Sequence, residues 1–231
     1  MVQINIPDPD HSNSEKAKRN FEFAVKLAAI IVAVIWLVFL VDGFLGLGLR
    51  QFGLVPRQLS GLAGIIMVPL LHANFPHIIS NSLPLFVGLL AMLYLYPNSA
   101  VKALPVLYFG TSILTWIYAR PNLHIGASGL IYGILTYVFV SGLLRRDMRS
   151  IGVTLLVYFL YGSMVWGVLP IREKMSWELH LSGVVLGVLL ALRFRHWDRI
   201  RIKEYDWEEN DEIPDWYKEE EKKASNTTWE E

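Results

Sequence analysis

The stretch GASGLIYG at residues 126–133 decides how the rest of the chain is interpreted. A polar loop containing Arg120 and His124 ends here, and an uncharged apolar run then continues to Leu144. Ser128 therefore stands at the mouth of a predicted membrane-spanning helix, between glycines that let other backbone approach closely. The free N–H groups at a helix start favour a developing negative charge beside this serine. A capping serine with packing glycines fits the stretch equally well.

The composition indicates a polytopic membrane protein. Of the 231 residues, 53% are hydrophobic, and several apolar runs approach the length of about twenty residues that a helix needs to cross a bilayer. The net charge is zero, so nothing indicates a nucleic-acid partner. The absence of cysteine excludes disulfides, thiolate metal sites and a cysteine nucleophile.

The hydrophobic pattern predicts an all-α bundle of six transmembrane helices over residues 21–196. The predicted spans are 23–41, 77–96, 101–119, 128–144, 151–169 and 177–192. A polar tail, residues 1–20, precedes the bundle, and a charged tail, residues 197–231, follows it. The loop 42–71 is rich in Gly, Leu and Phe, so we expect short interfacial helices and turns that lie partly among the lipid headgroups.

Basic residues predict the orientation, because cytoplasmic loops carry an excess of Lys and Arg. They gather at the start of the first span and after the second, fourth and sixth: Lys16, Lys18, Arg19, Lys26, Lys102, Arg145, Arg146, Arg149, Arg193, Arg195, Arg199, Arg201 and Lys203. The alternate loops carry fewer. We expect a multi-pass protein of a bacterial plasma membrane with both termini in the cytoplasm.

The even span count brings the polar residues of the spans to one depth. The second, fourth and sixth spans all begin on the non-cytoplasmic side. They carry His77 and Asn81, which are four residues apart and share a helix face, then Ser128, then His180. Intramembrane ionisable residues are functional candidates by default, although each of these could also bridge helices by a hydrogen bond.

Glycine stripes predict which helix faces meet. Small residues one turn apart let helix backbones approach closely in lipid. The stripes are Gly129 and Gly133 on the fourth span and Gly183 and Gly187 on the sixth. If they face each other, His180 comes beside Ser128, as a general base beside its nucleophile.

The remaining polar groups predict supporting roles. Tyr132, one turn beyond the serine, would hold the imidazole by packing. His77 and Asn81, with the serine N–H, are donors suited to a tetrahedral oxyanion. Glu178 is two residues from His180 and so points elsewhere. No carboxylate then fits the third position of a catalytic triad, and we expect a dyad.

Together these residues resemble the rhomboid intramembrane serine proteases. The motifs are His72-xxxx-His77-xxx-Asn81, then Gly126-Ala127-Ser128-Gly129 with Tyr132, and then His180-xx-Gly183-xxx-Gly187. The resemblance covers residues 23–195. It implies a Ser128–His180 dyad, an oxyanion hole with His77 and Asn81, and a partly embedded loop before the second span. It also implies cleavage of other membrane proteins in or near their transmembrane helices. We expect no metal or cofactor.

Such a substrate has to arrive from lipid between two spans. The fifth span is the predicted gate, because it has no catalytic polar group and carries the bulky residues Tyr158, Phe159, Tyr161 and Trp166. The embedded first loop is the alternative gate. The predicted partners are therefore transmembrane protein substrates and membrane lipid.

Three other functions remain open. A transporter also has interrupted helices with polar residues at depth, but no repeat relates the two halves of this chain. A non-catalytic rhomboid-like scaffold that binds membrane proteins would be expected to lack the serine or the histidine. A metal site built from His72, His77, His124 and His180 is less favoured, because the chain has no H-E-x-x-H helix and no acidic residue deep within a span.

Overall fold

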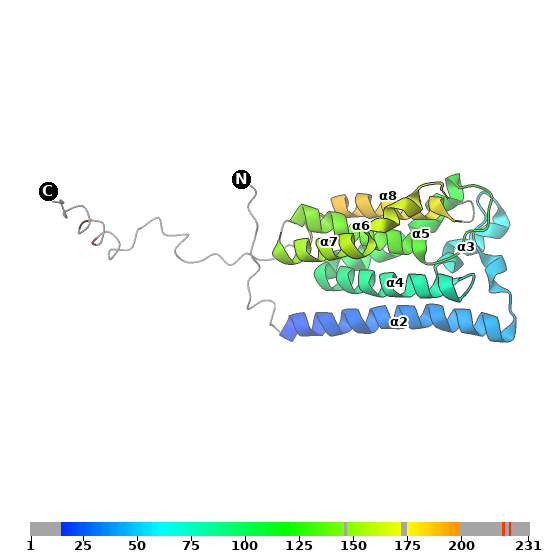
Figure 1. The fold of residues 1–231 in the computed structure, drawn as a ribbon, viewed down its shortest axis with the longest axis horizontal. Coiled ribbons are helices and arrows are strands. Elements are labelled where there is room, and N and C mark those ends of the chain that lie inside the picture. The colour runs from blue at the N-terminus through cyan, green and yellow to red at the C-terminus, as the bar shows by residue number, and fades with distance from the viewer. Residues whose placement is uncertain (1–14, 146, 172–174, 199–218, 220–221, 223–231) are drawn as a thin grey trace.

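The computed structural model describes residues 15–145, 147–171, 175–198, 219 and 222, and within them the long elements are helices. These are α2 (Glu15–Leu45), α4 (Phe75–Leu95), α5 (Pro97–Tyr118), α6 (Ser128–Arg145), α7 (Met148–Tyr161) and α8 (Trp177–Arg193). They run side by side along one direction (Figure 1). The predicted all-α bundle is confirmed. Most of both predicted tails lies outside the described residues.

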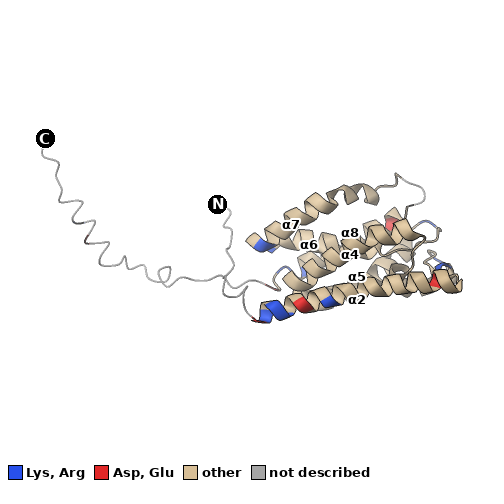
Figure 2. Cartoon of the chain, turned by 60° about the horizontal axis from the view of Figure 1, so that its bottom comes forward, with Lys and Arg blue, Asp and Glu red and all other residues tan. Residues whose placement is uncertain are grey.

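The bundle has the dimensions of a multi-pass membrane protein. The segments α2, α4, α5, α6 and α7 with its continuation to Val168 are each long and apolar enough to cross a membrane. Helix α8 has 17 residues, about 25 Å at 1.5 Å per residue, which is the lower limit for a span. The charged residues lie mainly toward the two ends of the bundle (Figure 2).

Helix α6 is the centre of the bundle, and small residues on it and on its neighbours explain why. It contacts α4, α5, α7 and α8, and most of its length is buried. A Cβ added at Gly142 would collide with the side chain of Thr154 on α7, and one at Gly88 on α4 would lie 3.0 Å from Ile134. Close approach therefore occurs on more than one side of α6.

Helix α2 lies at one edge of the bundle and packs against α4 (Figure 1). It begins at Glu15, ahead of the span predicted from residue 23. Hydropathy marks only the apolar part of a helix, whereas the backbone hydrogen bonds extend into the polar segment before it. The indole of Trp36 donates to the hydroxyl of Ser82 on α4 at 2.9 Å.

The loop after α2 contains the short helices that its composition predicted. They are η1 (Leu49–Phe52), η2 (Leu59–Ala63), α3 (Gly64–Met67) and η3 (Val68–Leu70). Leu54 pairs with His124 in an antiparallel bridge, with N–H to carbonyl distances of 3.0 and 2.8 Å. The Tyr108 hydroxyl donates to the Ile66 carbonyl at 2.7 Å. These bonds tie the loop to α5 and to the segment before α6.

The fifth span differs from a single α-helix. Helix α7 ends at Tyr161 and continues as the 3₁₀ helix η4 (Gly162–Val168). Buried residues on α7 are confined to Ser150, Thr154 and Val157, and none of the η4 residues is buried. This element is therefore held firmly at its first turns and loosely at its far end.

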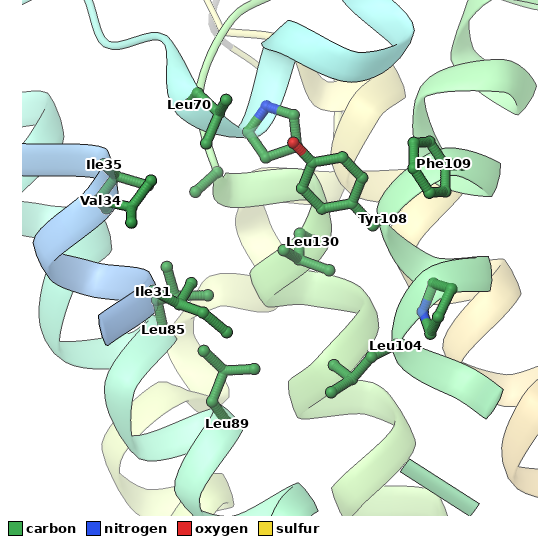
Figure 3. A pocket seen from close by; sticks show the side chains of 13 residues that line it. Ile31, Val34, Ile35, Leu70, Leu85, Leu89, Leu104, Tyr108, Phe109 and Leu130 are labelled. Atoms are coloured by element: carbon green, nitrogen blue, oxygen red, sulfur yellow. The ribbon is translucent and has the colours of Figure 1, made fainter. Parts of the chain in front are cut away.

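An apolar cavity of about 410 Å³ lies between α2, α4, α5 and the end of the first loop (Figure 3). Ala127 and Leu130, on either side of Ser128, belong to its wall, but none of the predicted site residues does. Apart from the Tyr108 hydroxyl, its side chains are hydrocarbon. The cavity therefore has no group suited to acid–base or nucleophilic chemistry.

Candidate active site

Ser128 and His180 lie in direct contact at one end of the bundle. The Nε2 atom of His180 is 2.8 Å from the Oγ atom of Ser128. Ser128 is the first residue of α6, and His180 lies in the first turn of α8. The histidine is 6% exposed, and the serine is partly accessible.

The contacts of the ring fix which nitrogen carries the proton. His180 Nδ1 lies 2.8 Å from the backbone carbonyl oxygen of Gly167. A carbonyl can only accept, so Nδ1 donates, and Nε2 of the neutral ring is left to accept from the Ser128 hydroxyl. This is the tautomer in which Nε2 can take a proton from the serine.

The glycine stripes set the height at which His180 meets α6. A Cβ added at Gly183 would collide with the carbonyl oxygen of Gly129, and one at Gly187 would lie 2.6 Å from the carbonyl oxygen of Gly133. The two helices therefore touch through their backbones, as the spacing of the glycines predicted. Larger residues at these positions would move the histidine away from the serine.

Tyr132 holds the plane of the imidazole. Its ring stacks on the His180 ring with centroids 4.2 Å apart and an interplanar angle of 10°. Its hydroxyl donates to the backbone carbonyl of Met164 at 2.7 Å. The aromatic stack limits rotation of the base about its side-chain bonds.

His77 and Asn81 border the same site from α4. Asn74 caps this helix, and its Oδ1 atom accepts from the His77 N–H at 3.0 Å. Gly126 has a φ of +115°, a conformation that favours glycine, and a Cβ there would lie 2.6 Å from His77 Nε2 and 3.7 Å from Asn81 Nδ2. Both side chains therefore lie beside the backbone that leads into Ser128.

Each of these two side chains keeps a donor beside Gly126, two residues before the serine. His77 Nδ1 accepts from the Ala73 N–H at 3.4 Å, which leaves the proton of the neutral ring on Nε2. Asn81 Nδ2 is buried and has no hydrogen-bond partner among the described residues. A buried unpaired donor costs about 1–3 kcal/mol, so a ligand oxygen at this place would be stabilised.

The two other histidines at this end of the bundle have structural contacts. His72 is buried, its Nδ1 pairs with the Leu70 carbonyl at 3.3 Å, and its ring lies 5.1 Å from that of His77. Burial, and next the neighbouring His77, lowers the pKa of His72 to about 4. Burial also lowers the pKa of His124, whose Nε2 pairs with the Arg120 carbonyl at 3.2 Å. Both are neutral near pH 7.

Glu178 is turned toward Arg120. Its buried carboxylate forms an ion pair with the guanidinium of Arg120, which also donates to the Met175 carbonyl at 3.3 Å. The pair joins the loop before α6 to the start of α8. Glu178 therefore contributes to the site by holding these two segments together.

The sequence did not reveal the backbone groups that contact the rings of His180 and Tyr132. The carbonyls of Gly167 and Met164 come from η4, in the span that has no polar catalytic side chain. A carbonyl is present in every residue, so it leaves no signal in the sequence. The one available signal was Gly167 itself, because a glycine within a span often marks a close approach.

The sequence of the chain is similar to a known protein family and to several bacterial and plant proteins. A family model described as the Rhomboid domain matches residues 59–197. An uncharacterized protein of Mycobacterium tuberculosis is 37% identical over 169 residues, which cover 69% of this chain and 70% of that protein. One from Mycobacterium leprae is 35% identical over 172 residues, covering 69% and 67%. The RHOMBOID-like protein 4 of Arabidopsis thaliana is 27% identical over 136 residues, covering 52% and 31%.

Proposed function

Because the chain belongs to the rhomboid family, we propose that it is an intramembrane serine endopeptidase that cleaves transmembrane segments of other membrane proteins. Ser128 is the nucleophile and His180 the general base. The observation that carries the proposal is the 2.8 Å contact between His180 Nε2 and Ser128 Oγ. A serine paired with a neutral histidine at this distance can be deprotonated as it attacks a carbonyl carbon.

The proposed reaction follows from the positions of the donors. Ser128 Oγ attacks the scissile carbonyl while His180 Nε2 takes its proton, and the negative charge develops on the substrate oxygen. His77 Nε2–H, Asn81 Nδ2–H and the backbone N–H at the start of α6 stabilise this oxyanion. His180 then protonates the leaving amine. A water molecule next attacks the acyl-enzyme while His180 takes its proton, and the Ser128 oxygen leaves with that proton, which releases the acid product and restores the dyad.

We propose that the dyad faces the non-cytoplasmic side of a bacterial plasma membrane. The basic residues near the starts of α2 and α7 and the ends of α6 and α8 support this orientation, and the mycobacterial relatives support a bacterial membrane. The bundle at residues 21–196 then has tails 1–20 and 197–231 in the cytoplasm. Cysteines at Ser12 and Asn226 should react only from the cytoplasmic side, and labelling of the two from opposite sides would contradict the even span count.

Activity can be tested with a serine-reactive fluorophosphonate and a panel of single-span substrates. The purified full-length protein should be labelled and should cleave at least one substrate, and Ser128→Ala should do neither. A transporter or a non-catalytic scaffold should give no labelling. If the wild type is not labelled, or if Ser128→Ala retains cleavage, the proposal is wrong.

A further inference from the structure

We propose that the backbone carbonyl of Gly167 is the positioning group of the dyad, so that η4 both admits the substrate and holds the catalytic base. This inference rests on the proposed function above. In a catalytic triad, the carboxylate of the third residue orients the histidine. Here a backbone carbonyl of the fifth span would take that role. Gly167 touches no substrate and acts only through His180.

The first observation is the hydrogen bond itself. His180 Nδ1 donates to the Gly167 carbonyl at 2.8 Å, and the neighbouring carboxylate of Glu178 is bound to Arg120. The carbonyl selects the tautomer with a free Nε2 and places its dipole where the imidazolium charge forms. Because it is neutral, it needs no desolvated counter-charge inside the membrane.

The second observation is that η4 contacts both rings of the site. The Tyr132 hydroxyl donates to the Met164 carbonyl at 2.7 Å. A Cβ added at Gly167 would collide with that hydroxyl and would lie 3.3 Å from His180 Nδ1. A glycine is therefore required for the carbonyl of residue 167 to reach the histidine.

The third observation is that η4 is otherwise weakly held. None of its residues is buried, and Trp166, next to Gly167, is 62% exposed. A 3₁₀ helix has poorer hydrogen-bond geometry than an α-helix. The hydrogen bonds to Tyr132 and His180 are thus contacts that join η4 to α6 and α8, and movement of η4 away from these helices would break both.

Substrate access and competence of the base are coupled as a result. When η4 moves aside, His180 Nδ1–H loses its acceptor, and neither the tautomer nor the ring position is fixed. The base becomes oriented again when η4 returns against the bound substrate. Loss of a hydrogen bond to a group that becomes charged should slow the reaction about tenfold to a hundredfold.

The test uses Gly167→Ala in the full-length protein, with Gly162→Ala as the matched control. A Cβ at Gly162, in the same element, meets only ring atoms of Tyr158, at 3.5 Å or more. For Gly167→Ala, the rate of fluorophosphonate labelling and kcat for a single-span substrate should both fall about tenfold to a hundredfold, with KM little changed. Gly162→Ala should match the wild type in all three.

Rescue separates positioning from general disruption. Removing the Tyr132 hydroxyl gives a Cβ at residue 167 most of the room it lacks, so the double variant Tyr132→Phe, Gly167→Ala should be labelled faster than Gly167→Ala alone. If Gly167→Ala is labelled at a rate within about twofold of the wild type, the inference is wrong, while labelling of Ser128 in the wild type keeps the proposed function intact. Failure of the wild type to be labelled would overturn the proposed function instead.

A spectroscopic measurement decides the question if Gly167→Ala does not fold. In the wild type with ¹⁵N-labelled histidine, and with His180→Gln to assign the signal, the neutral His180 ring should be the Nδ1-protonated tautomer. An Nε2-protonated ring would overturn the inference without any variant at Gly167.

Discussion

The carboxylate of Asp147 lies 3.1 Å from the guanidinium of Arg145 across the turn between α6 and α7, and both side chains are buried. Arg145 also donates to the Leu95 carbonyl at 2.7 Å. Asp147 caps α7 by accepting from the N–H and the hydroxyl of Ser150, at 2.9 and 2.7 Å. This cluster fixes one end of the fifth span, whereas η4 at the other end has no buried residue.

Breaking this anchor should destabilise the protein. Asp147→Ala removes the cap and leaves a buried guanidinium without its counter-charge, which should cost about 3–5 kcal/mol. Thermal unfolding in detergent should show a clearly lower Tm. The matched control is Glu15→Ala, which breaks the exposed pair with Lys18 and should change stability by less than about 1 kcal/mol. Equal effects of the two variants would contradict the anchor.

The dyad should behave as a unit. His180→Gln should be as inactive toward a single-span substrate as Ser128→Ala, because the serine is a weak nucleophile without its base. Combining the two changes should cost little more than either alone, since members of a catalytic unit are strongly non-additive. Residual turnover rates of the three variants measure this. If the loss of turnover in the double variant equals the product of the two single losses, the residues act independently.

The oxyanion donors should give graded losses. His77→Ala and Asn81→Ala should each lower kcat by roughly 10- to 1,000-fold, the scale of one lost oxyanion donor. Because these donors act on charge that develops in the transition state, KM should change less. Steady-state kinetics on one membrane substrate separates the two parameters. A change confined to KM would make these residues substrate-binding or structural groups.

Hydropathy and motif spacing predicted the bundle, because the membrane requires long apolar helices and the even span count brings three helix starts together. They could not predict that α2 begins at Glu15, since its first residues are polar, or that the fifth span changes to a 3₁₀ helix at Gly162. The contact between Gly167 and His180 is made by a backbone atom. The sequence did not predict the Arg145–Asp147 ion pair, because an arginine after the fourth span is already explained by the excess of basic residues in cytoplasmic loops. The roles of the site residues remain predictions.

His72 should make the protein sensitive to acid. Burial lowers the pKa of His72 from the usual histidine value of 6.5 to about 4, so between these values the unfolded chain binds the proton more tightly than the folded one. Its contribution to stability is complete above about pH 6.5 and is lost as the pH falls toward 4, by on the order of 3 kcal/mol. The free energy of unfolding, measured from pH 7 to 4, should therefore fall less steeply for His72→Gln than for the wild type. Parallel curves for the two proteins would contradict this.

The fifth span should control access of membrane substrates. Phe159 on α7 and Trp166 on η4 are 78% and 62% exposed. Truncating either side chain should therefore destabilise the fold little, while it removes a large ring from the surface of the fifth span. If displacement of this span limits cleavage, Phe159→Ala should raise kcat/KM for a single-span substrate by about 3- to 10-fold, a barrier change near 1 kcal/mol. A soluble peptide that arrives from water should gain much less. Leu189→Ala, at an exposed position of α8, is the matched control and should leave both rates unchanged.

Trp166→Ala provides a comparison within the same span. Trp166 is adjacent to Gly167, whose carbonyl accepts the hydrogen bond from His180, so its truncation should loosen the orientation of the base as well as the edge of the gate. The gain in kcat/KM should therefore be smaller than for Phe159→Ala, although both side chains are removed at exposed positions. Cleavage rates in reconstituted bilayers, normalised to fluorophosphonate labelling of each variant, separate the two effects. If both truncations lower cleavage of membrane substrates after that normalisation, α7 and η4 are not the gate, and the short helices between residues 49 and 70 become the element to test.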